Sequence, residues 1–156
     1  MDYESASLTI ALLARQPNAA QAIVNYLHDR FSAYSWVGLY WVDGSDLVLG
    51  EWMGPAATGH TRIAIGTGVC GAAAASGRTE VVADVSRDPR YLACFSSTKS
   101  EIVVPIFADG SVIGEIDIDG SGLNAFGAED QRLLEHVAAV LAGVRTGTSA
   151  ARAARR

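Results

Sequence analysis

Residues 100–120 read SEIVVPIFADGSVIGEIDIDG, and this stretch decides the fold. Two runs rich in apolar and β-branched residues, 101–108 and 112–119, flank Asp109-Gly110, a dipeptide typical of tight hairpin turns. The pattern predicts two long antiparallel strands joined by a short turn. Shorter strand signals precede the hairpin and an amphipathic helical pattern follows it.

The elements around the hairpin follow from the same kind of pattern. Further strands are predicted at 36–42, 47–53, 61–65 and 80–83. Helices are predicted at 7–15, after Pro17-Asn18, from Cys70 to a stop at Gly77, and along the apolar stripe of Leu133, Leu134, Val137, Val140, Leu141 and Val144. The helix after Pro17-Asn18 has an apolar face of Ile23, Leu27, Phe31 and Tyr34. We therefore expect an α+β fold with a central antiparallel sheet of about six strands and helices packed on it.

Length and charge limit the function classes. The chain has 156 residues and 16.3 kDa, which fits a single domain over 1–156 with a core at about 18–144. The Arg-rich segment 145–156 is interpreted as a frayed tail. The rest of the chain has eight basic and 17 acidic residues, a net charge of −9 that argues against a nucleic-acid partner. The sequence shows no apolar run long enough for a membrane span and no signal peptide, so we expect a cytoplasmic protein that binds no membrane.

The second strand of the hairpin carries alternating acids. Asp117 and Asp119 point to the face opposite Ile116 and Ile118, and their mutual repulsion is expected to raise at least one pKa. A three-residue loop would place Glu101 opposite Asp119, whereas a two-residue turn would place it opposite Ile118. We expect the first register, because it gathers three carboxylates at one end of the sheet. Such a cluster can bind an ammonium group, hold a metal or donate a proton, or it can simply be solvated.

The two cysteines, Cys70 and Cys94, are either buried thiols or redox thiols. Cys70 begins a small-residue helix, whose N-terminus would lower the thiol pKa, although a small core residue is an equally serious interpretation. Cys94 lies in the long segment 84–100, where a thiol can be exposed and reactive, but nearby acids would raise its pKa. Neither cysteine has the flanking Cys or His residues of a zinc site, so no metal is expected from their spacing. Trp36 and Tyr40 either line a pocket or belong to the core.

Several segments resemble one known family. They are SWVGLYW, LVLGEW, GTGVCGAAAASG, DV…YLAC…SEIVVPIF and VIGEIDIDG, and the resemblance runs from about Ile23 to Leu141. They are similar to free methionine-(R)-sulfoxide reductases, a branch of the GAF domain superfamily. The resemblance implies a GAF-like domain that reduces free L-methionine (R)-sulfoxide to L-methionine with thiols and no cofactor. It also implies thioredoxin as the external reductant and a homodimer.

The resemblance also assigns roles to residues of the two redox steps. Cys94 matches the nucleophile that attacks the sulfoxide sulfur and becomes a sulfenic acid. A second thiol then resolves this acid as a disulfide, which the reductant opens; because the favoured resolving cysteine of many relatives is absent here, either Cys70 or an external thiol takes that role. Glu101 and Asp119 match acids that act around the sulfoxide oxygen.

Four further residues match substrate-binding positions. Asp117, and more weakly Asp84, match acids that hold the substrate ammonium. Trp36 and Tyr40 match an aromatic wall around the sulfoxide methyl group.

The chain departs from the family pattern at three positions. His60 stands where many relatives have a third cysteine, Phe95 follows the Cys94 position where relatives usually have Asp, and Glu115 replaces an apolar residue. The competing hypothesis is a GAF module that senses a small ligand without catalysis. Substitution of Cys94 separates the two, since a sensor keeps its ligand affinity and a reductase loses turnover.

Overall fold

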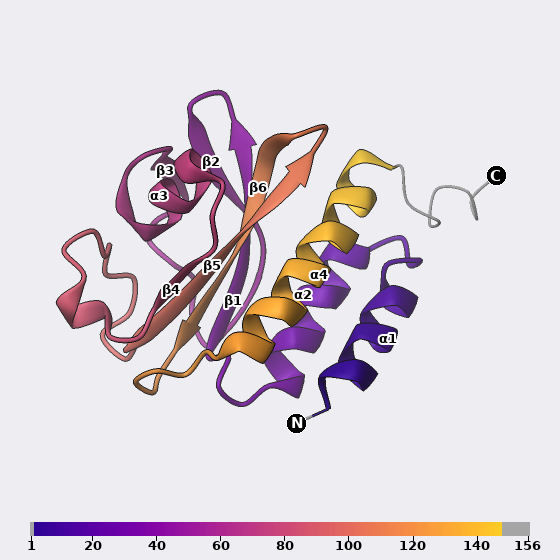
Figure 1. Cartoon of the computed structure of the whole chain (residues 1–156), viewed down its shortest axis with the longest axis horizontal. Coiled ribbons are helices and arrows are strands. Elements are labelled where there is room, and N and C mark those ends of the chain that lie inside the picture. The colour runs from indigo at the N-terminus through magenta and orange to yellow at the C-terminus, as the bar shows by residue number, and fades with distance from the viewer. Residues whose placement is uncertain (1, 148–156) are drawn as a thin grey trace.

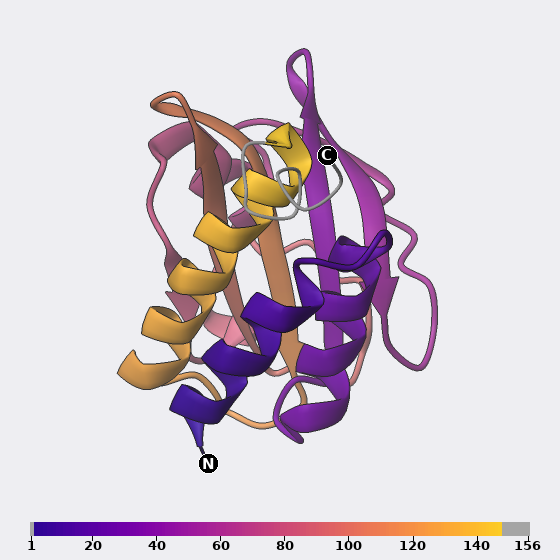
Figure 2. The same ribbon diagram turned by 90° about the vertical axis from the view of Figure 1, so that its right-hand side faces the viewer.

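The computed structural model describes residues 2–147 and shows a six-stranded antiparallel sheet in the order β3-β2-β1-β6-β5-β4. Helices α2 and α4 cover one face of the sheet and α1 packs across these two helices, while α3 lies on the other face (Figures 1 and 2). The predicted α+β architecture is confirmed. The strands are β1 Trp36–Asp43, β2 Asp46–Met53, β3 Arg62–Ala64, β4 Glu80–Val82, β5 Ser100–Ala108 and β6 Ser111–Gly120. The helices are α1 Tyr3–Leu13, α2 Ala19–Arg30, α3 Gly68–Ser76, the short 3-10 helix η1 Val85–Arg87 and α4 Ala128–Thr146.

The β5–β6 hairpin has the predicted register, but a different local structure produces it. Glu101 pairs with Asp119 as expected. The turn has only two residues, Asp109 and Gly110, both with positive φ (52° and 77°), so the expected three-residue loop is wrong. The additional residue is Ile113, which has no partner because the register shifts by one position next to it. This β-bulge restores the pairing that the longer loop was meant to supply.

The helices differ from their predicted bounds at the ends. Helix α1 begins at Tyr3 rather than near residue 7, because the Asp2 carboxylate accepts a hydrogen bond from the Ser5 N–H at 3.0 Å and caps the first turn. Helix α2 ends at Arg30, so two residues of its predicted face follow the helix. All four residues of that face are nevertheless fully buried, namely Ile23, Leu27, Phe31 and Tyr34.

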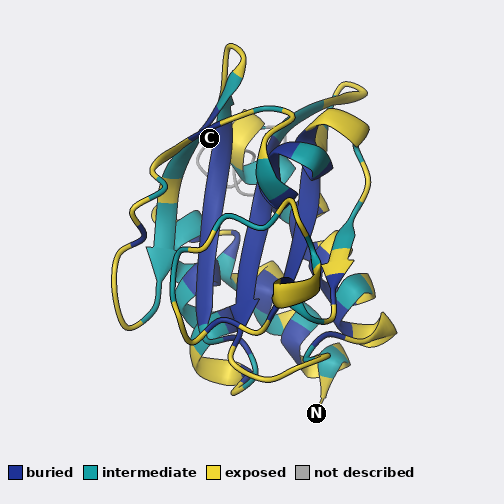
Figure 3. Cartoon of the chain, turned by 90° about the vertical axis from the view of Figure 1, so that its left-hand side faces the viewer, coloured by how far each residue is buried: buried dark blue, intermediate teal, exposed yellow. Residues whose placement is uncertain are grey.

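The sheet is buried on both faces. Ile116 and Ile118 of β6 pack into the large core beneath α2 and α4, while Glu115, Asp117 and Asp119 point to the opposite face. The central strands are dark blue on this second face in Figure 3, and within residues 2–147 the face is covered by α3, the short helix η1 and irregular segments. The acids of β6 therefore lie in the interior and not at a solvated edge.

The structure describes only the first three residues, 145–147, of the segment predicted to be a frayed tail. Arg145 belongs to α4, and its guanidinium lies 4.4 Å from the centre of the Trp41 ring. Residues 148–156, most of the predicted frayed tail, lie outside the described residues. Within residues 2–147, no helix is both long and apolar enough to cross a membrane.

Candidate active site

Five of the predicted site residues line one small enclosed cavity on the α3 face of the sheet. They come from five different segments: Tyr40 from β1, Cys70 from α3, Cys94 from the segment before β5, Glu101 from β5 and Asp117 from β6. Three apolar side chains complete the lining, those of Ile63, Val69 and Leu92. The cavity measures about 10 Å³, about the space of one water molecule. Both thiols and two acids thus line one cavity.

Cys70 lies at the centre of the acids. Its Sγ donates to Oε1 of Glu101 at 3.9 Å, and these atoms and a carboxylate oxygen of Asp117 all lie within 4.8 Å of one another. Burial raises the pKa of the Cys70 thiol well above its ordinary value, and the charges of Asp117, Glu115 and Glu101 raise this pKa further. The expected lowering by the helix N-terminus is therefore wrong, because desolvation and three neighbouring acids outweigh it.

The acids of the cluster have raised pKa values. Burial is the largest cause of the rise at Glu101, Asp117 and Asp119. The charge of Asp117 raises the pKa of Glu101 further, whereas hydrogen bonds from Glu101 and Cys70 oppose the rise at Asp117. Asp119 accepts a hydrogen bond from Thr98 Oγ1 at 3.3 Å.

Cys94 is a protonated thiol in this structure. Its pKa is raised to about 11, mainly by burial and also by the charges of Asp117 and Asp119, which agrees with the expected effect of nearby acids. Its side chain is half-buried, and Sγ lies 3.7 Å from the Leu92 carbonyl oxygen. A raised pKa lowers the fraction of the reactive thiolate form at neutral pH.

Comparison with known proteins shows the family of the chain. The GAF domain model matches residues 17–144. The chain is 33% identical over 134 residues to a free methionine-R-sulfoxide reductase of Escherichia coli (strain K12), an alignment that spans 84% of this chain and 80% of the relative. The structure of free methionine-R-sulfoxide reductase from Neisseria meningitidis in complex with its substrate superposes with a TM-score of 0.87. It shares 37% identity, with 97% of this chain and 91% of that chain covered. The chain belongs to the free methionine-R-sulfoxide reductase family of GAF domains.

A further member of the family, the type II free methionine-R-sulfoxide reductase from Thermoplasma acidophilum, superposes with a TM-score of 0.79 at 38% identity. The aligned part spans 86% of this chain and 94% of that chain. Against these solved structures the likeness thus extends over most of both chains in each pair.

Aromatic residues form one wall next to the cavity of this family member. The Trp36 indole is buried, stacks on Trp52 with ring centres 6.3 Å apart, and contacts the Phe95 ring at 6.1 Å. Gly38 makes room for it, since a Cβ at Gly38 would lie 2.1 Å from the indole. Trp36 does not line the small cavity itself, and it reaches the Cys94 segment through Phe95.

Asp84 lies outside the cavity. Its carboxylate accepts hydrogen bonds from the N–H and Oγ of Ser86 at 3.0 and 2.6 Å and lies 3.6 Å from the Arg87 guanidinium. These contacts cap η1 and, with Arg87, lower the pKa of Asp84. The structure does not bring Asp84 to the other predicted residues, and its role in substrate binding stays a prediction.

Sequence reasoning missed the part played by His60 and Thr58. The Tyr40 hydroxyl donates to the His60 carbonyl at 2.7 Å, and the His60 ring lies 3.2 Å from the Ala93 carbonyl. The Thr58 hydroxyl accepts from the His60 N–H at 3.1 Å and lowers the pKa of Cys94. The loop at 58–60 therefore connects β1 with the Cys94 segment, although no sequence pattern signals such a contact.

Glu115 also lies near the site, although the sequence analysis gave it no role there. Its side chain is fully buried and neither carboxyl oxygen has a hydrogen-bonding partner. Burial raises its pKa, as does the charge of Asp117, while an interaction with Cys70 opposes the rise. The alternation of β6 was the available signal, because it places Glu115 on the same face as Asp117.

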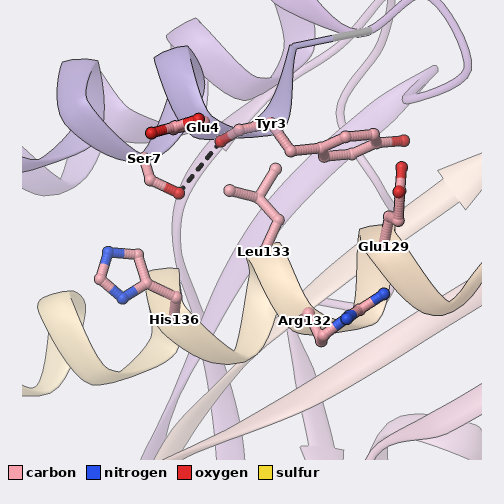
Figure 4. Close-up of a pocket in the computed structure, with 7 residues that line it drawn as sticks. All are labelled: Tyr3, Glu4, Ser7, Glu129, Arg132, Leu133 and His136. Atoms are coloured by element: carbon pink, nitrogen blue, oxygen red, sulfur yellow. Dashed lines mark hydrogen bonds between the residues drawn. The ribbon is translucent and has the colours of Figure 1, made fainter.

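A larger hollow elsewhere lacks this chemistry. It measures about 430 Å³ and lies between α1 and α4 (Figure 4). Its lining is Tyr3, Glu4, Ser7, Glu129, Arg132, Leu133 and His136. The hydrogen bond drawn there runs from Ser7 Oγ to the Tyr3 carbonyl at 3.1 Å. It contains no thiol and none of the predicted site residues, so the small cavity is the candidate active site.

Proposed function

We propose that this chain is an L-methionine (R)-S-oxide reductase that reduces free L-methionine (R)-sulfoxide to L-methionine with its own thiols and no prosthetic group. The observation that supports this most directly is the cavity in which Cys70, Cys94, Glu101 and Asp117 meet. The relatives named free methionine-R-sulfoxide reductase support the same reaction and the same substrate.

The first step transfers the sulfoxide oxygen to Cys94. The Cys94 sulfur attacks the sulfoxide sulfur while Glu101 protonates the sulfoxide oxygen, and the thiol proton of Cys94 passes to the Glu101 carboxylate, so that Glu101 ends the step protonated again. The S–O bond of the substrate breaks as its OH group moves to the Cys94 sulfur, and Asp119 lies beside the proton donor. Methionine leaves and Cys94 remains as a sulfenic acid, so the substrate gains the two electrons that Cys94 loses. A carboxyl with a raised pKa suits this task because it still holds a proton near neutral pH.

Substrate recognition uses the remaining residues. Asp117 provides the negative charge for the substrate ammonium, and hydrogen bonds from Glu101 and Cys70 favour its charged form. Tyr40 lines the cavity, and the Trp36 wall lies beside it to receive the methyl group. A cavity of about 10 Å³ is smaller than methionine sulfoxide, so the segment that carries Cys94 moves outward when substrate binds.

The second step regenerates the enzyme. The Cys70 thiol attacks the sulfenic sulfur of Cys94, an S–S bond forms, the S–O bond breaks, and the hydroxyl leaves as water with the thiol proton. Thioredoxin then reduces the disulfide. We place the enzyme in the cytoplasm, where that reductant operates, and as a homodimer, which light scattering after gel filtration tests.

The deciding experiment incubates the purified full chain with thioredoxin or dithiothreitol and separates the R and S epimers of free methionine sulfoxide. Selective loss of the R epimer is expected, and C94S removes it. The matched variant C70S still releases one methionine per chain in a single turnover without reductant. If both epimers persist while both thiols are shown to be reduced, and C94S binds the sulfoxide as tightly as the wild type, the chain is a ligand sensor instead.

A further inference from the structure

The acid cluster around Cys70 has no positive partner of its own. The groups that set the pKa values of Glu101, Glu115, Asp117 and Asp119 are other acids, the thiols and Thr98. Among the described residues, every ion pair of an arginine or a histidine is made with an acid outside this cluster. A buried cluster of acids without a cation beside it would be stabilised by an occupant that brings positive charge.

The ligand atoms have the spacing of a small metal site. Sγ of Cys70 and carboxylate oxygens of Glu101 and Asp117 lie within 4.8 Å of one another, and all three residues are buried. In a tetrahedral zinc site, Zn–S of about 2.3 Å and Zn–O of about 2.0–2.2 Å give ligand–ligand separations of about 3.3–3.6 Å. A contraction of about 1 Å would therefore bring these atoms to bonding distance around one ion.

Glu115 is an independent sign of a missing ligand. It is fully buried on the same face as Asp117, both of its oxygens lack partners, and its carboxyl interacts with Cys70. One oxygen of Asp117, Oδ1, lacks a partner as well. Unpaired buried oxygens cost about 1–3 kcal/mol each in stability, so something that pairs them is favoured. Glu115 thus lies beside the three-residue group, next to Cys70, as a further carboxyl without a hydrogen-bonding partner.

We propose that Cys70, Glu101, Asp117 and Glu115 form a binding site for one Zn²⁺ ion. The thiolate selects Zn²⁺ over Mg²⁺ and Ca²⁺, which prefer oxygen ligands alone. The ion displaces the thiol proton of Cys70 and the protons of the carboxylic acids. The two cysteines lack zinc spacing in the sequence because the other ligands come from the hairpin and not from neighbouring residues.

Occupation of this site has a consequence that rests on the proposed function. The ion would hold the Cys70 thiolate and the Asp117 carboxylate, which the reductase needs for its disulfide and for the substrate ammonium. Zn²⁺ is thus a reversible inhibitor that competes with substrate. The binding itself does not depend on whether the chain reduces sulfoxides.

The binding test uses the full chain reduced with a phosphine, since dithiols chelate zinc. Zn²⁺ alone is titrated against a chromogenic chelator, and Co²⁺ is added separately to reveal thiolate ligation by its charge-transfer absorption. One ion per chain is expected. C70S removes the absorption and weakens Zn²⁺ binding at least 100-fold, and E115Q weakens it at least tenfold. The matched controls C94S and E129Q, the latter at an exposed glutamate, bind as the wild type does.

The outcomes separate the two proposals. Absence of thiolate absorption when Co²⁺ is added to the wild type overturns the site, and this result needs no variant that must fold. Zn²⁺ binding that C70S retains, or that C94S abolishes, also overturns it. If the chain proves inactive toward methionine sulfoxide but binds Zn²⁺ through Cys70, the metal site stands and the reductase proposal fails. If it reduces the sulfoxide and Zn²⁺ does not inhibit, only the zinc proposal fails.

Discussion

Glu115→Leu is expected to stabilise the protein at neutral pH. The wild-type carboxyl is fully buried, and neither its O–H nor its C=O has a partner. Each unpaired buried group costs about 1–3 kcal/mol, and leucine fills a similar volume without polar atoms. The expected gain in the free energy of unfolding is about 2–4 kcal/mol, equivalent to about 6–12 °C in Tm for a domain of this size.

The pH dependence of this gain tests its cause. Folding raises the pKa of Glu115 above the value of 4.5 in the unfolded chain. Between these two pKa values the unfolded state has released a proton that the native state still holds, so wild-type stability falls as pH rises. The loss is at most about 1.4 kcal/mol per pH unit. The advantage of Glu115→Leu is therefore larger at pH 7 than at pH 5.

Urea unfolding followed by tryptophan fluorescence at the two pH values provides the measurement, with reductant present. Glu115→Gln is the matched control, because it removes the ionisation and keeps two polar groups in the same space. It is expected to show the pH-dependent part of the gain without the part that comes from lost polarity. A destabilised Glu115→Leu at pH 7, or an equal gain at both pH values, refutes the reasoning.

Three further predictions concern the Cys94 thiol, the proposed proton donor Glu101, and the hydrogen bond between Tyr34 and Asp130. Alkylation of Cys94 in the substrate-free protein is expected to be about 300-fold slower at pH 7 than alkylation of a free thiol, because the pKa of Cys94 is about 11. The rate of alkylation should rise with pH, and peptide mass spectrometry measures it. Reductase activity falls on the alkaline side as the raised pKa of Glu101 is passed, and a flat profile would exclude Glu101 as the proton donor. Tyr34→Phe removes a buried 2.6 Å hydrogen bond to Asp130 and is expected to lower the free energy of unfolding, measured with urea, by about 1.5–3 kcal/mol. The control Tyr26→Phe, at a tyrosine for which no side-chain hydrogen bond is described, should change this free energy little.

The sequence predicted the faces of the strands better than the connections between them. Alternation was sufficient to place Asp117 and Asp119 opposite Ile116, because a side chain in a strand has only two directions available. The bulge at Ile113 could not be predicted, since no residue type there demands it and the pairing of Glu101 with Asp119 is equally compatible with a longer loop. The register was thus correct while its supposed cause was wrong.

The candidate site was predictable in composition and not in geometry. The meeting of Cys70 and Cys94 depends on how α3 and a 17-residue irregular segment fold over the sheet, which local patterns do not encode. The helix-end argument for Cys70 failed because it counts a partial charge and omits burial. Asp84 shows the opposite problem, since an acid that caps a short helix looks the same in sequence as an acid that binds an ammonium.

Even-numbered and odd-numbered residues of β5 and β6 lie on opposite buried faces of the sheet and have different roles. On β5 and β6 the even-numbered residues Ile102, Ile116 and Ile118 hold the helices, and the odd-numbered Glu101 and Asp117 reach the cavity. One layer of backbone separates these two sets, so adjacent residues of a strand alternate between packing against the helices and facing the cavity. A lineage that keeps the even positions can therefore exchange the odd ones and acquire a new ligand or reaction without rebuilding its scaffold.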